Sequence, residues 1–161
     1  MSLISFALQR ENICKRIFAT SAYTARAREA MGVPPAIVER MLITADDIDI
    51  INPHIENSAN EVYTDIVRYH PGSSIRFTQD ECGGFYIFNI KVPSNYPTNN
   101  VDTLKQSIES YISNRTLQSL YTDLKPDEAS IIATKTKSDA VTIQMLLTQR
   151  ENPSTLLQEI Q

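Results

Sequence analysis

Glycine and cysteine are scarce in this chain, and tryptophan is absent. Only four glycines occur among the 161 residues, so a glycine-rich phosphate-binding loop is nearly excluded. The two cysteines, Cys14 and Cys82, lie far apart in the sequence. Without a CxxC pair, neither a zinc knuckle nor a thioredoxin-like redox site is indicated. We expect two reduced thiols in a chain that stays inside a cell.

Long apolar runs are also missing. No run approaches the roughly 20 residues that a membrane-spanning helix needs. The opening residues, MSLISFALQRENICKR, have too short an apolar part for a secretion signal. The 42% hydrophobic and 21% charged residues are typical of a folded, soluble chain, and the length suits one domain. The composition therefore predicts a globular protein without a membrane anchor.

The net charge of −4 is distributed unevenly. Residues 1–40 hold six basic and three acidic side chains, a balance of +3, so the rest of the chain carries −7. An acidic body with a mildly basic arm argues against a general nucleic-acid binder. The arm suits self-association or an acidic partner, although solvated surface charge is the commoner explanation.

Helical spacing dominates the first half of the chain. It predicts a helix over residues 3–31, which Gly32 and the pair Pro34-Pro35 end, and a short helix over 35–41. The clearest periodic signal follows, with apolar residues spaced by three and four: Ile48, Ile51, Ile55, Ala59, Val62, Ile66 and Tyr69. We expect Pro53 to kink this helix or to restart it with Asn52 as a cap.

Three carboxylates, Asp46, Asp47 and Asp49, stand at the start of that helix. Thr44 precedes Asp47 by three residues, which is the spacing of a capping box with Asp in place of Glu. Acids are favoured in the first turn because the N–H groups there are unpaired and the helix dipole is positive. A metal site would need further ligands that this sequence does not obviously supply. We therefore predict that these acids begin a helix.

Two strands are predicted around a glycine-containing turn. Residues 74–79 and 85–92 are rich in aromatic and β-branched side chains, and Gly83-Gly84 in the turn DECGG provides the positive φ angles of a hairpin. One face carries the apolar side chains Tyr86, Phe88, Ile90 and Val92. We expect this face to cover a helical core.

The second half continues as a helical pair. Asn100 is placed to cap a helix over residues 101–122, and Pro126 suits the first turn of a second helix that runs to about residue 149. The short joint between them predicts antiparallel neighbours. The sequence thus predicts a mostly α fold, a bundle of about four helices with one β-hairpin (74–92) inserted between the central helix and the C-terminal helical hairpin. Its parts are an N-terminal helical arm (1–43), a helical core (44–150) and a C-terminal extension (151–161).

Catalytic motifs are not apparent. His54 and His70 are the two histidines, and no HExxH, nucleophile-elbow or kinase-type run occurs. The turn residues Asp80, Glu81 and Cys82 are a weak candidate for a metal cluster. We predict no catalytic residue, cofactor or metal, and a triad assembled only in space is the enzymatic alternative left open.

Five residues are candidates for contacts with partners. Arg26 and Arg28 suit an acidic partner or phosphate, with two solvated arginines as the alternative. Leu156, Leu157 and Ile160 form a small apolar cluster after Pro153, with little chain left to bury it. We expect this extension to be held by neighbouring copies or partner chains.

The order of the segments resembles a known family. A long helix that begins with acids (TADDIDIINPHIENSANEVY) leads to a hairpin (SIRFTQDECGGFYIFNIKV), a polar crossing (PSNYPTNN) and a helical hairpin that begins with VDTLKQSIESYISNRTLQSLY. This resembles the small helical head–tail connector, or adaptor, proteins of tailed bacteriophages over about residues 40–150. The shared motifs are helix types and spacings rather than invariant residues. The extended N-terminal helix with its double proline departs from the family pattern.

The resemblance implies a non-enzymatic ring of identical subunits, often twelve, in the virion at the head–tail joint. The ring would dock beneath the portal, meet a tail or second neck protein, and bound a channel through which genomic DNA passes without sequence-specific binding. It also implies C-terminal tails that reach into the portal ring, a role that Leu156, Leu157 and Ile160 would fill here. Such a protein is made in the host cytoplasm and does not contact a membrane.

Two other functions are compatible with the same sequence. One is a tail-completion or tail-terminator protein of the same particle. The other is a small helical protein-binding module unrelated to virions.

Overall fold

The computed structural model describes residues 1–150. In this part the chain is mostly helical, with five α-helices and a three-stranded antiparallel sheet. The predicted fold class, a helical bundle with a β-hairpin before the C-terminal helical pair, is confirmed. Across residues 1–150 no helix has both the length and the apolar character needed to cross a bilayer.

The elements follow one another with short connections. Their order is β1 (Ser2–Gln9), α1 (Arg10–Ala30), α2 (Pro35–Met41), the 3₁₀ turn η1 (Ala45–Asp47), α3 (Ile48–Tyr69), β2 (Ser74–Thr78), β3 (Phe85–Val92), the 3₁₀ turn η2 (Thr98–Asn100), α4 (Val101–Tyr121) and α5 (Pro126–Thr148).

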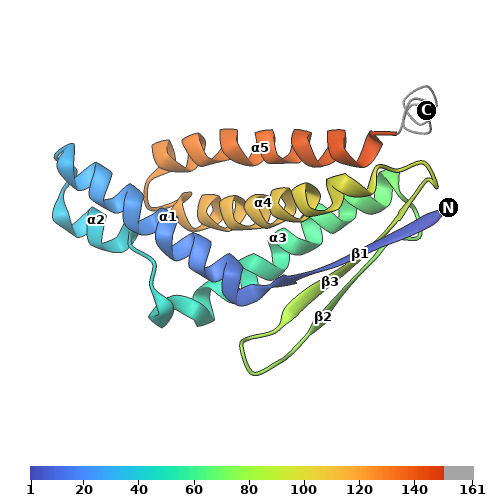
Figure 1. Cartoon of the computed structure of the whole chain (residues 1–161). Helices are drawn as coiled ribbons and strands as arrows, with labels where there is room; N and C mark the ends of the chain where they lie inside the picture. Colours follow the sequence, from blue (N-terminus) through green and yellow to red (C-terminus); the bar gives the residue numbers. More distant parts are fainter. Residues whose placement is uncertain (151–161) are drawn as a thin grey trace.

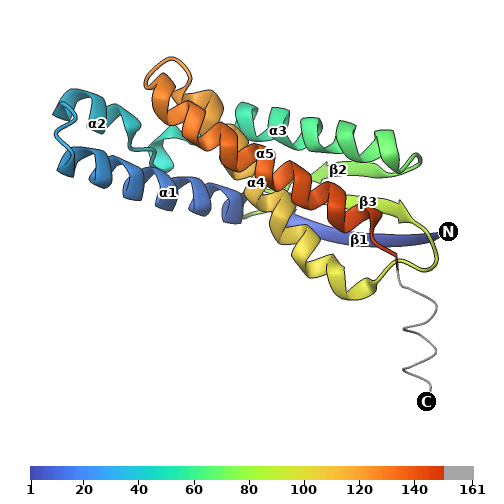
Figure 2. The same cartoon turned by 90° about the horizontal axis from the view of Figure 1, so that it is seen from above.

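Helix α4 lies at the centre of the molecule. Figure 1 shows α5 along one side of α4, and α1, α3 and the sheet on the other side. The hairpin of α1 and α2 extends at one end of the elongated molecule, and the sheet lies toward the other end, as the view from above also shows (Figure 2). One buried cluster joins these layers, with members that include Leu8, Ile17, Ile55, Phe88, Ile112 and Leu147.

The predicted helix over residues 3–31 is wrong for its first residues. Ser2–Gln9 form strand β1, and the helix α1 begins only at Arg10. Ile4 and Leu8 are buried and Phe6 is half-buried, and they alternate with exposed side chains. This period of two fits a strand, and β3 offers the edge on which that strand pairs. The predicted hairpin is therefore the outer part of a sheet with the order β1-β3-β2.

The hairpin itself forms as predicted. Tyr86, Phe88, Ile90 and Val92 are all buried on the side of the helices. Gly83 and Gly84 have φ angles of 100° and 96°, which other residues rarely adopt. Arg10 stabilises the end of the sheet next to the turn. Its guanidinium lies 4.2 Å from the ring centroid of Phe77 on β2 and donates to the hydroxyl of Tyr86 on β3 at 3.1 Å.

Helix α3 buries the predicted stripe from Ile51 to Ile66, while its two ends, Ile48 and Tyr69, remain exposed. The helix continues through Pro53 and does not restart at Asn52. Pro53 is the sixth helical residue, so its missing N–H removes one bond near the start of a helix that packing supports along its length.

Helices α4 and α5 occupy the predicted ranges and lie side by side, joined by the short segment before Pro126. Asn100 does not cap α4 with its side chain. It lies in η2, and its side chain donates to the Gln149 side chain just after α5 instead. On α5, Ile131 is exposed, whereas Ile132, Ile143, Leu146 and Leu147 are buried.

Candidate interaction surfaces

The acids at the start of α3 form a cap. The Asp47 carboxylate accepts a hydrogen bond from the Thr44 N–H at 3.0 Å, and the Thr44 hydroxyl accepts from the Asp46 N–H at 3.4 Å. The two residues form the predicted capping box, which precedes α3 as the turn η1. Within residues 1–150 no group of three or more His, Cys, Asp or Glu side chains is placed to hold a metal ion.

The histidines and the acidic turn have structural contacts. His70 is buried at the end of α3, and its Nδ1 lies 3.0 Å from the Lys91 carbonyl oxygen of β3. His54 contributes its backbone carbonyl, which accepts from the Ser58 hydroxyl. In the turn, the Asp80 carboxylate accepts from the N–H groups of Cys82 and Gly84 at 2.9 and 2.7 Å. These groups therefore support helix ends and turns.

The two candidate arginines have different surroundings. Arg28 forms an ion pair with Glu128, with 2.7 Å between Nε and Oε2, and the Glu128 side chain is 5% exposed. The hydrogen bond and the charge of Glu128 raise the pKa of Arg28. Arg26 is exposed on the surface of α1. Arg28 thus joins two elements of its own subunit, and Arg26 remains the candidate for an external partner.

The remaining candidates, Leu156, Leu157 and Ile160, lie outside the described residues. Their predicted role in partner contacts remains a prediction.

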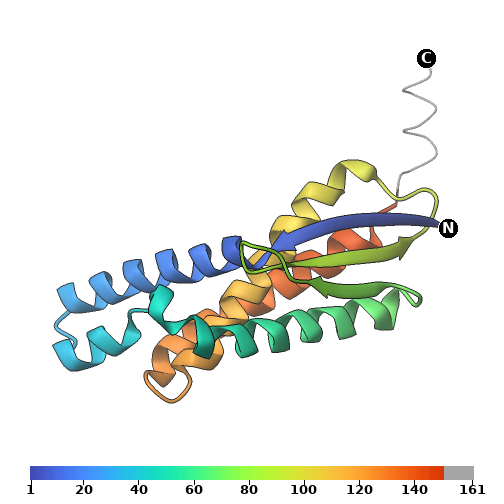
Figure 3. The same ribbon diagram turned by 90° about the horizontal axis from the view of Figure 1, so that it is seen from below.

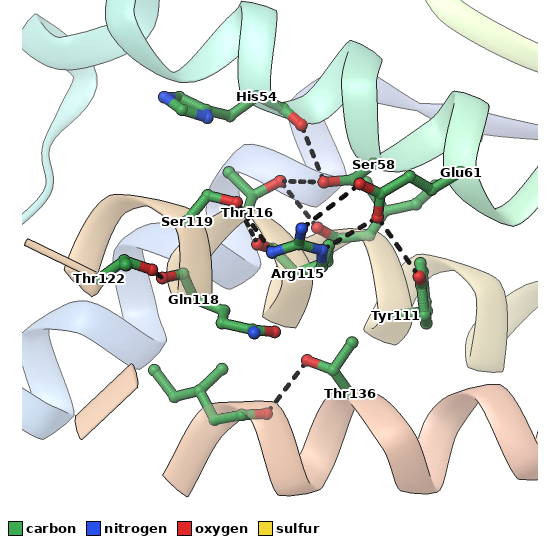
Figure 4. A network of polar contacts seen from close by, with 12 residues as sticks. His54, Ser58, Glu61, Tyr111, Arg115, Thr116, Gln118, Ser119, Thr122 and Thr136 are labelled. Carbon is green, nitrogen blue, oxygen red and sulfur yellow. Dashed lines mark hydrogen bonds and ion pairs between the residues drawn. The ribbon is translucent and has the colours of Figure 1, made fainter. Parts of the chain in front are cut away.

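Polar side chains of α3 and α4 lie close together in the middle of the bundle (Figure 4). The Ser58 hydroxyl donates to the His54 carbonyl, and the Thr116 hydroxyl donates to the Ile112 carbonyl, each at 2.8 Å. The two hydroxyl oxygens lie 3.3 Å apart. Since each hydroxyl has one hydrogen, the two cannot bond each other while both donate to their own helices. Each hydroxyl therefore chiefly satisfies its own helix.

A charged contact lies beside these hydroxyls. Arg115 on α4 approaches both carboxylate oxygens of Glu61 on α3, at 2.9 and 3.4 Å, and Figure 4 shows Tyr111 on the other side of the same carboxylate. Burial and the neighbouring charges of Glu61 and Asp65 raise the pKa of Tyr111 to about 12. Tyr111 is therefore a neutral hydrogen-bond donor at physiological pH, and the cluster holds α3 against α4.

A groove of about 200 Å³ opens between α3 and α5 near the Tyr111 side chain. Ile66 and Leu147 contribute to its apolar lining, and Arg68 and Asp65 add charged groups. Tyr69 and Val141 extend from the groove to the protein surface, where Val141 is 56% exposed.

Met145 lies one helical turn after Val141 and is 58% exposed. We name Tyr69, Val141 and Met145 the α3/α5 surface. These side chains are too exposed to contribute much to the subunit's own core, so their apolar area is available to a partner.

A second apolar surface lies at the opposite end of α3. Leu42 and Ile50 are exposed there, Ile50 to 61%, and we name them the α2/α3 surface. Leu42 and Ile50 line a hollow of about 310 Å³ whose other walls include Leu120 and Tyr121 of α4. A buried hydrogen bond stabilises one wall of the hollow: the Tyr121 hydroxyl donates to the Met41 carbonyl at 2.7 Å.

Comparison with known proteins gave no match. Neither the family models, the curated proteins nor the solved structures include one that this chain matches. The arrangement of the side chains is therefore the basis on which we propose a role.

Sequence reasoning missed both surfaces because it assigned apolar residues to buried stripes. The signal was present in the spacing. Ile50 lies off the stripe that contains Ile51 and Ile55, and Val141 and Met145 lie off the side of α5 that buries Ile143 and Leu147. Apolar residues outside the buried stripe of an amphipathic helix leave apolar area on the protein surface that a partner can cover.

Proposed function

We propose that this chain is a structural, non-enzymatic protein of a bacteriophage virion, a head–tail connector whose copies form a ring on the portal. The observation that carries the proposal is the pair of dissimilar apolar surfaces, α2/α3 and α3/α5, at the two ends of one helix. The 22 residues of α3 separate them by about 30 Å.

Two unlike surfaces suit a head-to-tail contact. When the α2/α3 surface of one copy binds the α3/α5 surface of the next copy, the same contact repeats from copy to copy. The copies close into a ring if the rotation between neighbours adds up to a full turn. The order of helix, hairpin, crossing and helical pair, which resembles the connector family, supports the same role. The net charge of −7 outside residues 1–40 also suits a wall that DNA passes without being gripped.

The experiment is assembly on the purified portal protein of the same virus, followed by native mass spectrometry and particle images. The wild-type chain is expected to form a ring on the portal. Ile50→Glu and Val141→Glu are each expected to prevent the ring, because each buries a charge in one side of the contact. Thr142→Glu, on an exposed neighbour of Val141, is the matched control and should assemble normally.

A monomer that ignores the portal would contradict the proposal, as would rings that form equally well with both glutamate variants. A chain that joins a tail-tube protein instead of the portal would favour the terminator function. A chain without residues 153–161 is expected to fold but to dock more weakly. Loss of subunit stability in that chain, as large as that from a core deletion, would contradict the predicted partner contact.

A further inference from the structure

Within residues 1–150, one edge of strand β1 has no pairing partner. The N–H of Arg10 donates to the Gly84 carbonyl at 3.0 Å, which extends the β1–β3 ladder by one hydrogen bond. Antiparallel pairs alternate between bonded and non-bonded, so Leu8 and every second residue before it exchange backbone bonds with β3. The residues between them, Leu3, Ser5 and Ala7, direct their backbone groups away from β3. Among residues 1–150 no backbone or side-chain group bonds to this outer edge.

The edge also lacks the devices that normally protect edge strands. Residues 2–9, SLISFALQ, contain no charged side chain and no proline, and Leu3 is 58% exposed. The opposite edge, β2, is shorter and carries Arg76 at its centre. Charge, proline and short length are the usual means by which proteins prevent unwanted pairing. Strand β1 is therefore the edge that is ready to accept another strand.

A further strand beside β1 would be covered by α4. Figures 2 and 3 show that the first part of α4 extends past β1 on the side away from β3. A strand added beside β1 would lie against this part of α4, where Val101 is only half-buried. The half-buried ring of Phe6, stacked on Phe88 at 5.5 Å between centroids, would gain a neighbour on its open side.

We propose that β1 of a second copy covers this edge in the free protein, in an antiparallel pair related by a twofold axis. The inner face of β1 carries the even-numbered residues Ile4, Phe6 and Leu8. These side chains stay on the inner face of both strands only if even-numbered residues of one copy lie opposite even-numbered residues of the other. With Ser5 opposite Ser5, residues 2–8 of both copies pair. Phe6 then meets Ile4 on the inner face, and Leu3 meets Ala7 on the outer face. Both strands are uncharged, so the contact opposes no like charges although each chain carries −4.

This inference does not rest on the connector function. A ring whose subunits all point in the same direction contains no such twofold axis. The β1 pair therefore belongs to the free chain and must open when a ring forms. The ring contacts and the β1 contact can then fail independently, and different variants test them.

The decisive experiment places charges at the centre of the pair. Ser5→Lys and Ser5→Glu each set like charges opposite each other, and each is expected to be monomeric by sedimentation where the wild-type chain is a dimer. An equimolar mixture of the two variants is expected to restore the dimer, because opposite charges then meet. Ser74→Lys, an exposed serine on the other edge strand, is the matched control and should leave the dimer intact.

Hydrogen exchange identifies the edge. In the dimer the N–H groups of Leu3, Ser5 and Ala7 are expected to be protected, and dilution or either Ser5 charge variant should remove this protection. If the Ser5 variants fail to fold, Ala7→Pro provides the test. This variant removes the Ala7 N–H, which points away from β3 toward the second copy, and it should also be monomeric.

A wild-type monomer, a mixture that stays monomeric, or a dimer with unprotected edge amides would overturn the proposal. Protection in a monomer that disappears when the chain ends at residue 150 would also overturn it, because the edge would then be covered by the chain's own C-terminal segment.

Discussion

Arg28 Nε lies 2.7 Å from Glu128 Oε2, so the last turn of α1 is tied to the first turn of α5. Arg28 lies at the C-terminal end of α1, where the helix dipole favours a positive charge, and Glu128 lies at the N-terminal end of α5, where it favours a negative charge. The carboxylate is buried and the guanidinium is partly exposed, and the pair holds the end of the α1–α2 hairpin against the rest of the bundle.

Removal of Arg28 should therefore destabilise the subunit. Arg28→Ala leaves a buried carboxylate without its partner, and we expect a loss of about 1–3 kcal/mol in the free energy of unfolding, measured with urea. Arg26→Ala, on an exposed neighbour of the same helix, is the control and should change stability by less than about 0.5 kcal/mol. Equal losses in the two variants would show that the ion pair does not stabilise the fold.

The raised pKa of Tyr111 predicts a loss of stability in alkali. The pKa is raised from 10.0 to about 12, so folding favours the protonated hydroxyl. This contribution is fully present below pH 10 and is lost as the pH rises toward 12. The free energy of unfolding of the wild-type chain should fall over this range.

In Tyr111→Phe the decline should be smaller but not absent, because burial also raises the pKa of Tyr121. Urea unfolding at a series of pH values measures both slopes. Identical slopes in the two chains would contradict the assignment to Tyr111.

The hydroxyls of Ser58 and Thr116 should act independently. Each donates to its own helix at 2.8 Å, so their 3.3 Å approach adds little. Ser58→Ala and Thr116→Val should each change the free energy of unfolding by about 1 kcal/mol. In the double variant the two changes should add to within about 0.5 kcal/mol. A coupling of more than about 1 kcal/mol in this double-mutant cycle would instead indicate a direct hydrogen bond between the helices.

The two acids before α3 should differ in importance. Asp47→Ala removes the carboxylate that accepts from the Thr44 N–H, and we expect a loss of about 1 kcal/mol in thermal or urea unfolding. Asp46→Ala should cost less, because Asp46 contributes its backbone N–H to the cap and that group remains. A melting temperature that rises with divalent cations in the wild-type chain but not in Asp47→Ala would contradict the capping role and indicate a metal site.

Local patterns in the sequence determined most of the helices and the hairpin. Three of these patterns act on neighbouring residues: the apolar spacing of α3, the Thr44–Asp47 pair and the Gly83-Gly84 turn. Their effect on backbone conformation can therefore be predicted from the sequence alone. The buried face of β3 followed from the alternation of apolar and polar side chains in its sequence.

Only the tertiary structure determined that residues 2–9 form a strand and that Glu128 is the partner of Arg28. The alternation of Ile4, Phe6 and Leu8 is short, and it became a strand because β3 offered an edge on which to pair. Glu128 lies a hundred positions from Arg28, so helical packing alone brings them together. Packing also left Ile50 and Met145 outside the core, because α3 and α5, unlike the central α4, each bury only one side of their surface.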